Sequence, residues 1–473
     1  MAIDMSKYVN LIKNVGLFAF SNFAVKLITF FLVPLYTYYL STAEYGITDM
    51  LSTVVWILTP LGTLSVADAT LRFCIEKKDN ARSYASVGFG ITLFSCLVVA
   101  CLLPCLDISF FGGLGEHKLW FLLCYAAMSF QGYFSSLSRG VGQVSVMAVA
   151  SAFSAIINIV CTIPTIVLWG WGVNGFFVSL FLGNVAGCAW YLVVGKLYRY
   201  LTFDKSFIAD LKPMLRYSIP LVPNALFWWM IQGINRFFIT GMIGIAASGI
   251  FAAASKIPSL LKLLTGVFEQ AWSLSAFQEF KSKDSSRFFN LIYHIYNSCL
   301  ATCIAILIPL SQWIASFFLQ KDFFSAWVLV PTLLISFYYS TLNAFYGSIY
   351  TSSMKTRFLF VTTMIGGIVC VFFNYIFLLA YGLIGACVAS AISNAVVWIL
   401  RVSDSRKIIE IRLNLISVIL TNIVLIAMAF MTSLQVENWL ILDIFLIGIM
   451  ILVHSVELKP YIRILKNKIM LRK

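Results

Sequence analysis

Charge is scarce in this sequence. Charged residues make up 11% of its 473 positions, hydrophobic residues make up 61%, and the mean hydropathy is +0.92. A soluble globular protein of this length needs a far more polar surface, so the composition excludes that class. Apolar runs long enough to cross the hydrocarbon core, which takes about 20 helical residues, recur along the whole chain. We therefore predict an all-α polytopic membrane protein.

The sequence also lacks the signatures of an enzyme. It has no P-loop, no nucleophile motif and no cluster of catalytic residues, and its longest predicted outer loop, roughly 106–117, is short. The three histidines, His117, His294 and His454, have no metal-ligand neighbour at helical spacing, which favours packing roles. The 11 cysteines are scattered, mostly within apolar runs, so we expect no disulfide framework. We expect no catalytic residue, no metal and no cofactor.

Hydropathy divides the chain into 14 predicted spans joined by short connections. The first apolar run is too long for a cleavable signal peptide and lacks a cleavage site. The predicted spans are 14–40, 46–68, 84–106, 118–138, 145–169, 173–195, 214–240, 245–273, 288–318, 323–350, 358–380, 383–400, 413–434 and 438–456.

Basic residues alternate between the two sides of these spans. With a cytoplasmic N-terminus, 27 of the 33 Lys and Arg residues fall in inner segments or at the inner end of a span, Lys118 and Lys321 fall in outer loops, and four lie deeper within spans. This bias follows the positive-inside rule and predicts that both termini are cytoplasmic. It also accounts for the net charge of +14 without nucleic acid as a partner. The basic tail, 461–473, is expected to contact membrane lipids.

Two alignments within the chain indicate an internal repeat. Residues 43–50 (AEYGITDM) align with 246–253 (AASGIFAA), and 172–184 align with 382–394, at offsets of 203 and 210 residues. Repeats of six spans begin on the same side, so a pseudo-two-fold axis along the membrane normal would relate them, a plan used for alternating access. The predicted parts are an N-terminal lobe of spans 1–6, a C-terminal lobe of spans 7–12, and spans 13–14 with the tail, at residues 1–200, 201–402 and 403–473.

Prolines interrupt many predicted spans, and one pair stands within a single helical turn. Pro220 and Pro223 each remove a helix hydrogen bond, and Asn224 is at hand to bond the freed groups. We interpret these three residues as a candidate hinge in the seventh span.

Several lysines lie deep in predicted spans, where a charge costs roughly 2.5–3.5 kcal/mol on insertion scales. Lys26, Lys256 and Lys262 are too deep for easy snorkelling, and together with Arg236 they predict a cationic cavity for an anionic cargo such as phosphate or pyrophosphate. Lys256 and Lys262 are about 240° apart on a helix, so one of them faces the cavity unless the intervening proline turns the chain. Glu269 would carry a proton or pair with Lys262.

The remaining membrane charges lie closer to the predicted surfaces. Arg236 and Asp49, near the outer surface, are read most simply as snorkelling side chains. Asp68 and Arg72 are one turn apart near the inner surface, which favours a structural ion pair. The alternative for Asp49, Asp68 and Glu269 is a role in ion coupling.

One string resembles a known family. Residues 216–261, RYSIPLVPNALFWWMIQGINRFFITGMIGIAASGIFAAASKIPSLL, together with 31–50 and 382–390, are similar to the polysaccharide transporter family of the multidrug/oligosaccharidyl-lipid/polysaccharide exporter superfamily. That family includes the bacterial O-antigen and capsule repeat-unit flippases. It commonly has an acidic residue before the arginine of this motif, where this chain has Asn235, so a role tied to that acid does not carry over.

The resemblance implies a non-enzymatic flippase for undecaprenyl-pyrophosphate-linked oligosaccharides in the bacterial cytoplasmic membrane. It also implies alternating access of two lobes, coupling to an H⁺ or Na⁺ gradient, and a glycan polymerase as a further partner. The alternatives are a multidrug cation antiporter or a peptidoglycan-precursor flippase of the same superfamily, and a membrane glycan polymerase or ligase. Deep lysines and 14 spans disfavour the antiporter, and the short outer loops disfavour the polymerase.

Overall fold

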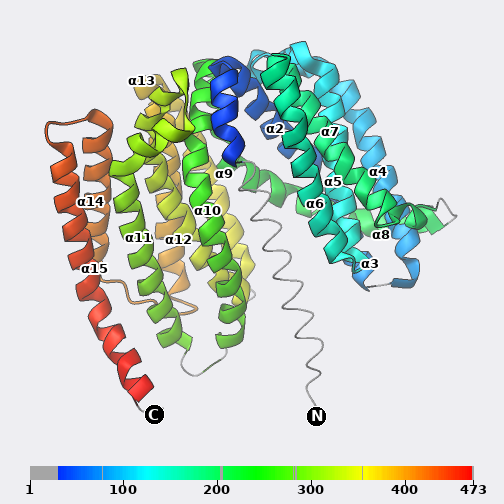
Figure 1. Cartoon of the computed structure of the whole chain (residues 1–473). Coiled ribbons are helices and arrows are strands. Elements are labelled where there is room, and N and C mark those ends of the chain that lie inside the picture. The colour runs from blue at the N-terminus through cyan, green and yellow to red at the C-terminus, as the bar shows by residue number, and fades with distance from the viewer. Residues whose placement is uncertain are drawn as a thin grey trace. The chain divides into compact units, whose positions relative to one another are not determined.

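The computed structural model describes residues 30–76, 78–202, 206–280, 282, 285–353 and 355–470, and this part of the chain is helical without any β-strand (Figure 1). Residues 30–39 are helical. The α-helices that follow are α2 (Thr42–Gly62), α3 (Val66–Glu76), α4 (Ala81–Leu102), α5 (Lys118–Gly140), α6 (Val144–Thr162), α7 (Gly172–Val193), α8 (Ser206–Ser218), α9 (Leu221–Met242), α10 (Ile245–Glu279), α11 (Ser285–Phe318), α12 (Val330–Ser352), α13 (Thr356–Ser405), α14 (Leu415–Leu434) and α15 (Trp439–Met470).

Short helical turns fill most of the connections. They are η1 (Lys78–Asn80), η2 (Leu103–Asp107), η3 (Ser109–Phe111), η4 (Leu114–His117), the π-helical η5 (Ile163–Leu168), η6 (Leu197–Tyr200) and η7 (Lys321–Leu329).

The membrane class predicted from hydropathy is confirmed. Among the described residues, nine helices are long and apolar enough to cross a membrane, or ten if α2 and α3, bent by 54° at their junction, form one span. The long helix α13 contains two predicted spans, because Gly382 breaks it with φ 59° and ψ −138°, a conformation open to glycine. A helix covers each predicted range after the first, although the total of 14 spans stays a prediction.

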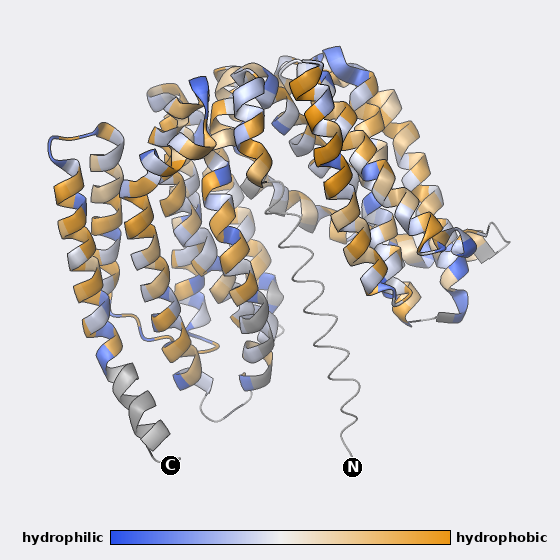
Figure 2. Cartoon of the chain, viewed as in Figure 1, coloured by the Kyte–Doolittle hydropathy of each residue, from blue (hydrophilic) through white to orange (hydrophobic). Residues whose placement is uncertain are grey.

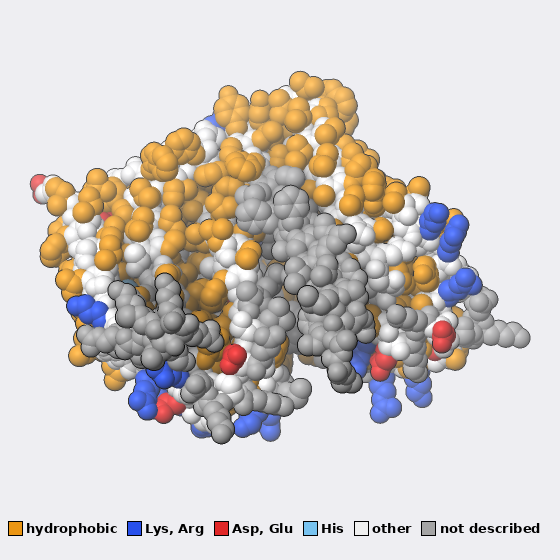
Figure 3. All heavy atoms as spheres, turned by 60° about the horizontal axis from the view of Figure 1, so that its bottom comes forward, with side chains coloured by type: hydrophobic (Ala, Val, Ile, Leu, Met, Phe, Trp, Pro, Cys, Tyr) orange, Lys and Arg blue, Asp and Glu red, His pale blue; other side chains and the backbone are white. Residues whose placement is uncertain are grey.

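The chain forms two compact units, residues 1–252 and 253–473, which are described separately here. The division of the sequence into lobes at residues 200 and 402 stays a prediction, as does the axis between them. Within each unit hydrophobic residues cover much of the helix sides (Figure 2), and Lys and Arg side chains gather toward the helix ends that the turned view brings forward (Figure 3).

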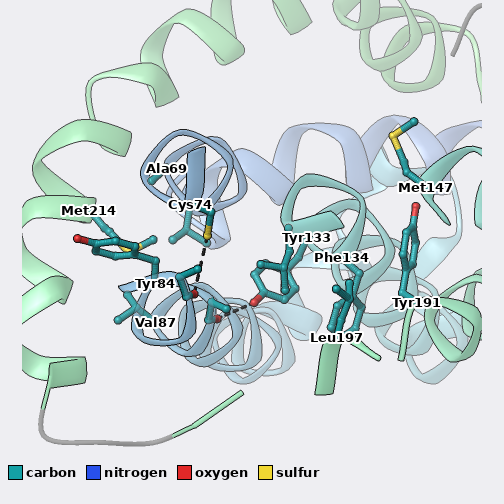
Figure 4. Close-up of a cluster of buried hydrophobic side chains, with 14 of the residues drawn as sticks. Ala69, Cys74, Tyr84, Val87, Tyr133, Phe134, Met147, Tyr191, Leu197 and Met214 are labelled. Atoms are coloured by element: carbon teal, nitrogen blue, oxygen red, sulfur yellow. Dashed lines mark hydrogen bonds between the residues drawn. The ribbon is translucent and has the colours of Figure 1, made fainter. Parts of the chain in front are cut away.

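The core of the first unit is built from small and aromatic side chains of α3–α8. Figure 4 shows two of its polar links: the Tyr133 hydroxyl donates to the carbonyl of Ala85 at 2.6 Å, and the Cys74 thiol lies 3.8 Å from the carbonyl of Ala81. Each link satisfies a polar atom inside an apolar cluster, where an unpaired one would be costly. These contacts fix α5 and α3 against α4.

A pair of glycines lets the start of α2 cross the start of α10 within the first unit. A Cβ atom placed on Gly46 would overlap the carbonyl of Ile245, and one on Gly249 would overlap the carbonyl of Thr42. The two clashes are equivalent under the 203-residue offset of the predicted repeat, since it maps Thr42 onto Ile245 and Gly46 onto Gly249. The crossing therefore has local two-fold symmetry.

In the second unit, stacked rings and a buried arginine hold the helices. Trp272 of α10 stacks on Phe345 of α12 with centroids 4.6 Å apart and donates to Ser348 at 2.7 Å. Arg401 of α13 is buried among neutral oxygen acceptors of α12 and α13. Arg401 directly follows the predicted span 383–400, and its buried guanidinium joins two helices.

Candidate functional site

A buried ion pair joins α2 to α9. The Arg236 guanidinium donates to the Asp49 carboxylate, and the side chains are only 17% and 9% exposed. The snorkelling interpretation of these two residues is therefore wrong, because the charges lie inside the unit and satisfy one another. Sequence could not show this, since 187 positions separate the partners.

A tryptophan extends this contact along the same two helices. The indole nitrogen of Trp229 donates to the carbonyl of Thr53 at 3.2 Å, and the indole lies 5.3 Å from the Phe237 ring, edge to face. Side chains on one face of α9 thus bind one face of α2 over several turns.

A cavity of about 740 Å³ lies beside the junction of α8 and α9. Its walls come from the bend after α2, from α3, and from both sides of that junction. We call it the Arg72 pocket; its lining residues are Ser65, Asp68, Leu71, Arg72, Ile75, Glu76, Tyr217, Leu221 and Ala225.

The charged wall of this pocket is organised around Arg72. The guanidinium lies 5.2 Å from the centroid of the Tyr217 ring, within cation–π distance, and its Nε is 3.6 Å from the Glu76 carboxylate. Asp68 lines the same pocket, but Arg72 pairs with Glu76 and not with Asp68. The predicted Asp68–Arg72 ion pair is therefore wrong. Arg72 and Glu76 are both more than half exposed, which leaves them accessible to a ligand.

The predicted hinge residues lie at one edge of the pocket. The predicted span 214–240 is two helices, α8 and α9, interrupted at Ile219 and Pro220, and Pro220 immediately precedes α9. Pro223 stands in the first turn of α9, where a missing N–H leaves no helical bond unmade. The side chain of Asn224 lies outside the described residues, and the hinge itself stays a prediction.

The deep lysines of the second unit lie on α10. Lys256 is half-buried and Lys262 is exposed, and the helix continues through Pro258, so the two point to different sides. Glu269, half-buried, follows Lys262 by two helical turns. Lys26 lies outside the described residues, and the cationic cavity stays a prediction.

Sequence reasoning missed a polar cluster in the second unit. His294, His454 and Glu457 meet where α11, α14 and α15 pack, so the statement that no histidine has a metal-ligand neighbour at helical spacing is wrong for His454. The only signal available was the spacing of His454 and Glu457, three residues apart on one helix. No group of three His, Cys, Asp or Glu residues suited to a metal ion occurs in the part of the chain that the structure describes.

These features define a polytopic, all-α membrane protein with a charged pocket beside a helix break. The family model described as polysaccharide biosynthesis protein matches residues 11–273. The chain therefore belongs to this polysaccharide biosynthesis family, and its fold is similar to that of solved flippases and transporters.

Solved structures support the fold at low sequence identity. The lipid II flippase MurJ in an inward closed conformation matches with a TM-score of 0.72 and 15% identity, over 94% of this chain and 99% of that one. An inward-facing multidrug resistance MATE family transporter matches at 0.65 and 16%, over 82% and 93%. A MOP superfamily transporter from Pyrococcus furiosus matches at 0.56 and 15%, over 83% and 96%. No curated protein sequence matches the chain.

Proposed function

We propose that the chain is a flippase that moves undecaprenyl-pyrophosphate-linked glycan repeat units from the cytoplasmic to the outer leaflet of the bacterial inner membrane. The Arg72 pocket carries this proposal, because charged and aromatic side chains lie there beside an apolar wall. A lipid-linked sugar has matching parts: a phosphorylated head, sugar rings and a hydrocarbon tail. Membership of the polysaccharide biosynthesis family supports the same cargo class.

The residues of the pocket suit different parts of that head group. The planar guanidinium of Arg72 can donate two parallel hydrogen bonds to a phosphate, stronger than bonds between neutral groups. The carboxylates of Asp68 and Glu76 can accept hydrogen bonds from sugar hydroxyls, and the ring of Tyr217 offers an apolar face. Two acids beside one base also disfavour a purely phosphate-binding role.

We propose that the cargo crosses by alternating access with an H⁺ or Na⁺ gradient as the driving force, and that Pro220 and Pro223 serve as a hinge. The lysines Lys26, Lys256 and Lys262 would attract the pyrophosphate along its path. Glu269 is our candidate for ion coupling in the second unit. Both termini would be cytoplasmic, and a glycan polymerase would receive the product.

The test is a flipping assay with purified protein in proteoliposomes. Labelled undecaprenyl-pyrophosphate oligosaccharide is loaded in one leaflet, and its arrival in the other is read with a membrane-impermeant glycan-cleaving enzyme. We expect transfer by the wild type and a loss of about tenfold or more for Arg72→Ala, the equivalent of one charge-assisted hydrogen bond. Arg199→Ala is the matched control, because Arg199 stacks on its neighbour Tyr198 at 5.8 Å and does not line the pocket.

Other outcomes would redirect the assignment. Transfer of a peptidoglycan precursor but not of oligosaccharide repeat units would make the chain a precursor flippase. Drug export without glycan transfer would make it a multidrug antiporter. Glycosyl transfer by the purified protein would make it a polymerase and overturn the proposal.

A further inference from the structure

Three titratable side chains meet where α11, α14 and α15 pack together in the second unit. His294 Nδ1 lies 2.7 Å from Glu457 Oε1, and His454 Nδ1 lies 3.2 Å from Glu457 Oε2. The side chains of His294, His454 and Glu457 are 2%, 3% and 7% exposed. None of them belongs to the Arg72 pocket, and the proposed flipping mechanism does not use them.

Hydrogen-bond counting fixes the protons of His294. Its Nε2 lies 3.0 Å from the carbonyl oxygen of Arg412, which can only accept, so Nε2 must carry a hydrogen. Its Nδ1 faces a carboxyl oxygen at 2.7 Å, and two lone pairs at that distance would repel. One further proton must therefore lie between Nδ1 and Oε1.

The surroundings of Glu457 decide where that proton rests. The Ser417 hydroxyl of α14 donates to Oε2 at 2.5 Å, and His454 approaches the same oxygen. Donors thus converge on both oxygens, and such convergence favours an ionised carboxylate. The proton then belongs to His294, which becomes an imidazolium in a buried, hydrogen-bonded ion pair.

Other groups near the cluster do not compete for this role. Ser298 and Thr421 lie 3.0 Å and 3.3 Å from the two ring nitrogens of His454. The buried phenols Tyr293 and Tyr338 are near enough to Glu457 to interact electrostatically. Of the charged side chains in the neighbouring connection, Lys407 pairs with Asp404, and Arg412 and Glu410 form a weak pair, 82% and 64% exposed. Arg406 is also exposed.

We propose that His294 and Glu457 form a proton-binding site that holds α15 on α11. The proton on His294 lets the two groups approach to 2.7 Å, and the imidazolium charge balances that of the carboxylate. When pH rises far enough to remove this proton, the neutral ring holds a single hydrogen, so one of its two hydrogen bonds, to Glu457 or to the Arg412 carbonyl, is lost. When pH falls far enough to protonate Glu457, the ion pair is lost as well. The attachment of the C-terminal helices is therefore expected to weaken both at high pH and at low pH.

The first test is ¹⁵N NMR of protein labelled only at histidine. The chain has three histidines, so the spectrum is simple to assign with His→Gln variants. We expect both ring nitrogens of His294 to carry protons at pH 7, because each of them faces an oxygen acceptor. In Glu457→Gln, His294 should keep a proton on Nε2 alone. A singly protonated His294 in the wild type would overturn the proposal, and this result needs no variant that might fail to fold.

The second test is thermal unfolding of the wild type and variants at pH 7 and pH 9. We expect Glu457→Gln and His294→Gln to lower the unfolding midpoint at pH 7. The difference from the wild type should shrink at pH 9, because the wild type then also loses a hydrogen bond of His294. Ser433→Ala is the matched control, since Ser433 ties α14 to the Val328 carbonyl at 3.0 Å without a titrating group. Its difference from the wild type should be equal at both pH values. Equal pH behaviour of all variants would contradict the proposal.

Discussion

Arg236 and Asp49 form an ion pair that is almost entirely removed from solvent, although one residue lies on α9 and the other on α2. Removing one partner deletes this ion pair from the interior of the unit. We expect Arg236→Gln to destabilise the protein by about 3–5 kcal/mol, as found for broken buried pairs. The measurement is denaturant unfolding in detergent micelles.

The charge-reversed double variant Asp49→Arg/Arg236→Asp supplies the control for this pair. Contact residues of this kind show interaction energies of about 0.5–3 kcal/mol in double-mutant cycles. The double variant should therefore be more stable than the sum of the two single changes predicts. Strict additivity would mean that each side chain acts through other neighbours.

The close crossing of α2 and α10 predicts that stability is sensitive to any side chain added at the crossing. Gly249→Ala places a methyl group against the carbonyl of Thr42, so the helices must separate, and we expect a loss of about 1–3 kcal/mol. Gly132→Ala in α5 is the matched control, because nothing lies within 4 Å of its added Cβ atom and alanine favours the helix. Both are read by thermal unfolding, and equal midpoints for the two variants would refute the close crossing.

The Arg72 pocket predicts a loss of transport without a loss of stability. Tyr217→Phe keeps the ring beneath Arg72 and should transport like the wild type, whereas Tyr217→Leu removes the cation–π contact and the face offered to a sugar. We expect a several-fold loss of flipping for the leucine variant and a stability change within about 1 kcal/mol. If Tyr217→Leu lowers stability as much as it lowers flipping, Tyr217 has a structural role and does not bind the cargo.

Substitution of Arg401 is expected to lower stability, because the side chain holds two helices together and does not line the Arg72 pocket. Its Nε donates to Thr362 at 3.1 Å, and its terminal nitrogens donate to the Asn343 carbonyl at 2.7 Å and to Thr363 at 3.0 Å. Lysine cannot reproduce this fork, so Arg401→Lys should cost about 2–4 kcal/mol of unfolding free energy. Arg412→Lys, at a side chain 82% exposed, should change it by less than about 0.5 kcal/mol. Thermal unfolding of the two variants compares them directly.

The positions of the helices could be predicted from sequence because lipid imposes a strict length and polarity on each span. The breaks could be predicted as well, since Pro220 interrupts the seventh span where expected and the break at Gly382 falls in the predicted connection between the spans 358–380 and 383–400. Glycine matches between repeats also identified the residues of the α2–α10 crossing, although not their contact.

The side-chain partners could not be predicted, because helical spacing allows more than one. Asp68 and Glu76 each stand four residues from Arg72, and the usual preference for an acid on the N-terminal side favours Asp68. The structure pairs Arg72 with Glu76, since the ring of Tyr217 from another helix sets the side-chain direction. For His294 and Glu457, 163 positions apart, no local pattern exists.

The seam between α14 and α15 bears on how the chain enters the membrane during synthesis. Asp443, in the last apolar run, is fully buried and accepts a hydrogen bond from Thr432 at 2.6 Å, across the short connection that joins the two helices. A lone helix carrying this carboxyl would meet an insertion penalty of about 2.5–3.5 kcal/mol. Because Thr432 lies on the preceding helix, one carboxyl oxygen of Asp443 already has a hydrogen-bond donor when the last helix enters the lipid. The last two helices are therefore expected to leave the translocon together, as one hairpin.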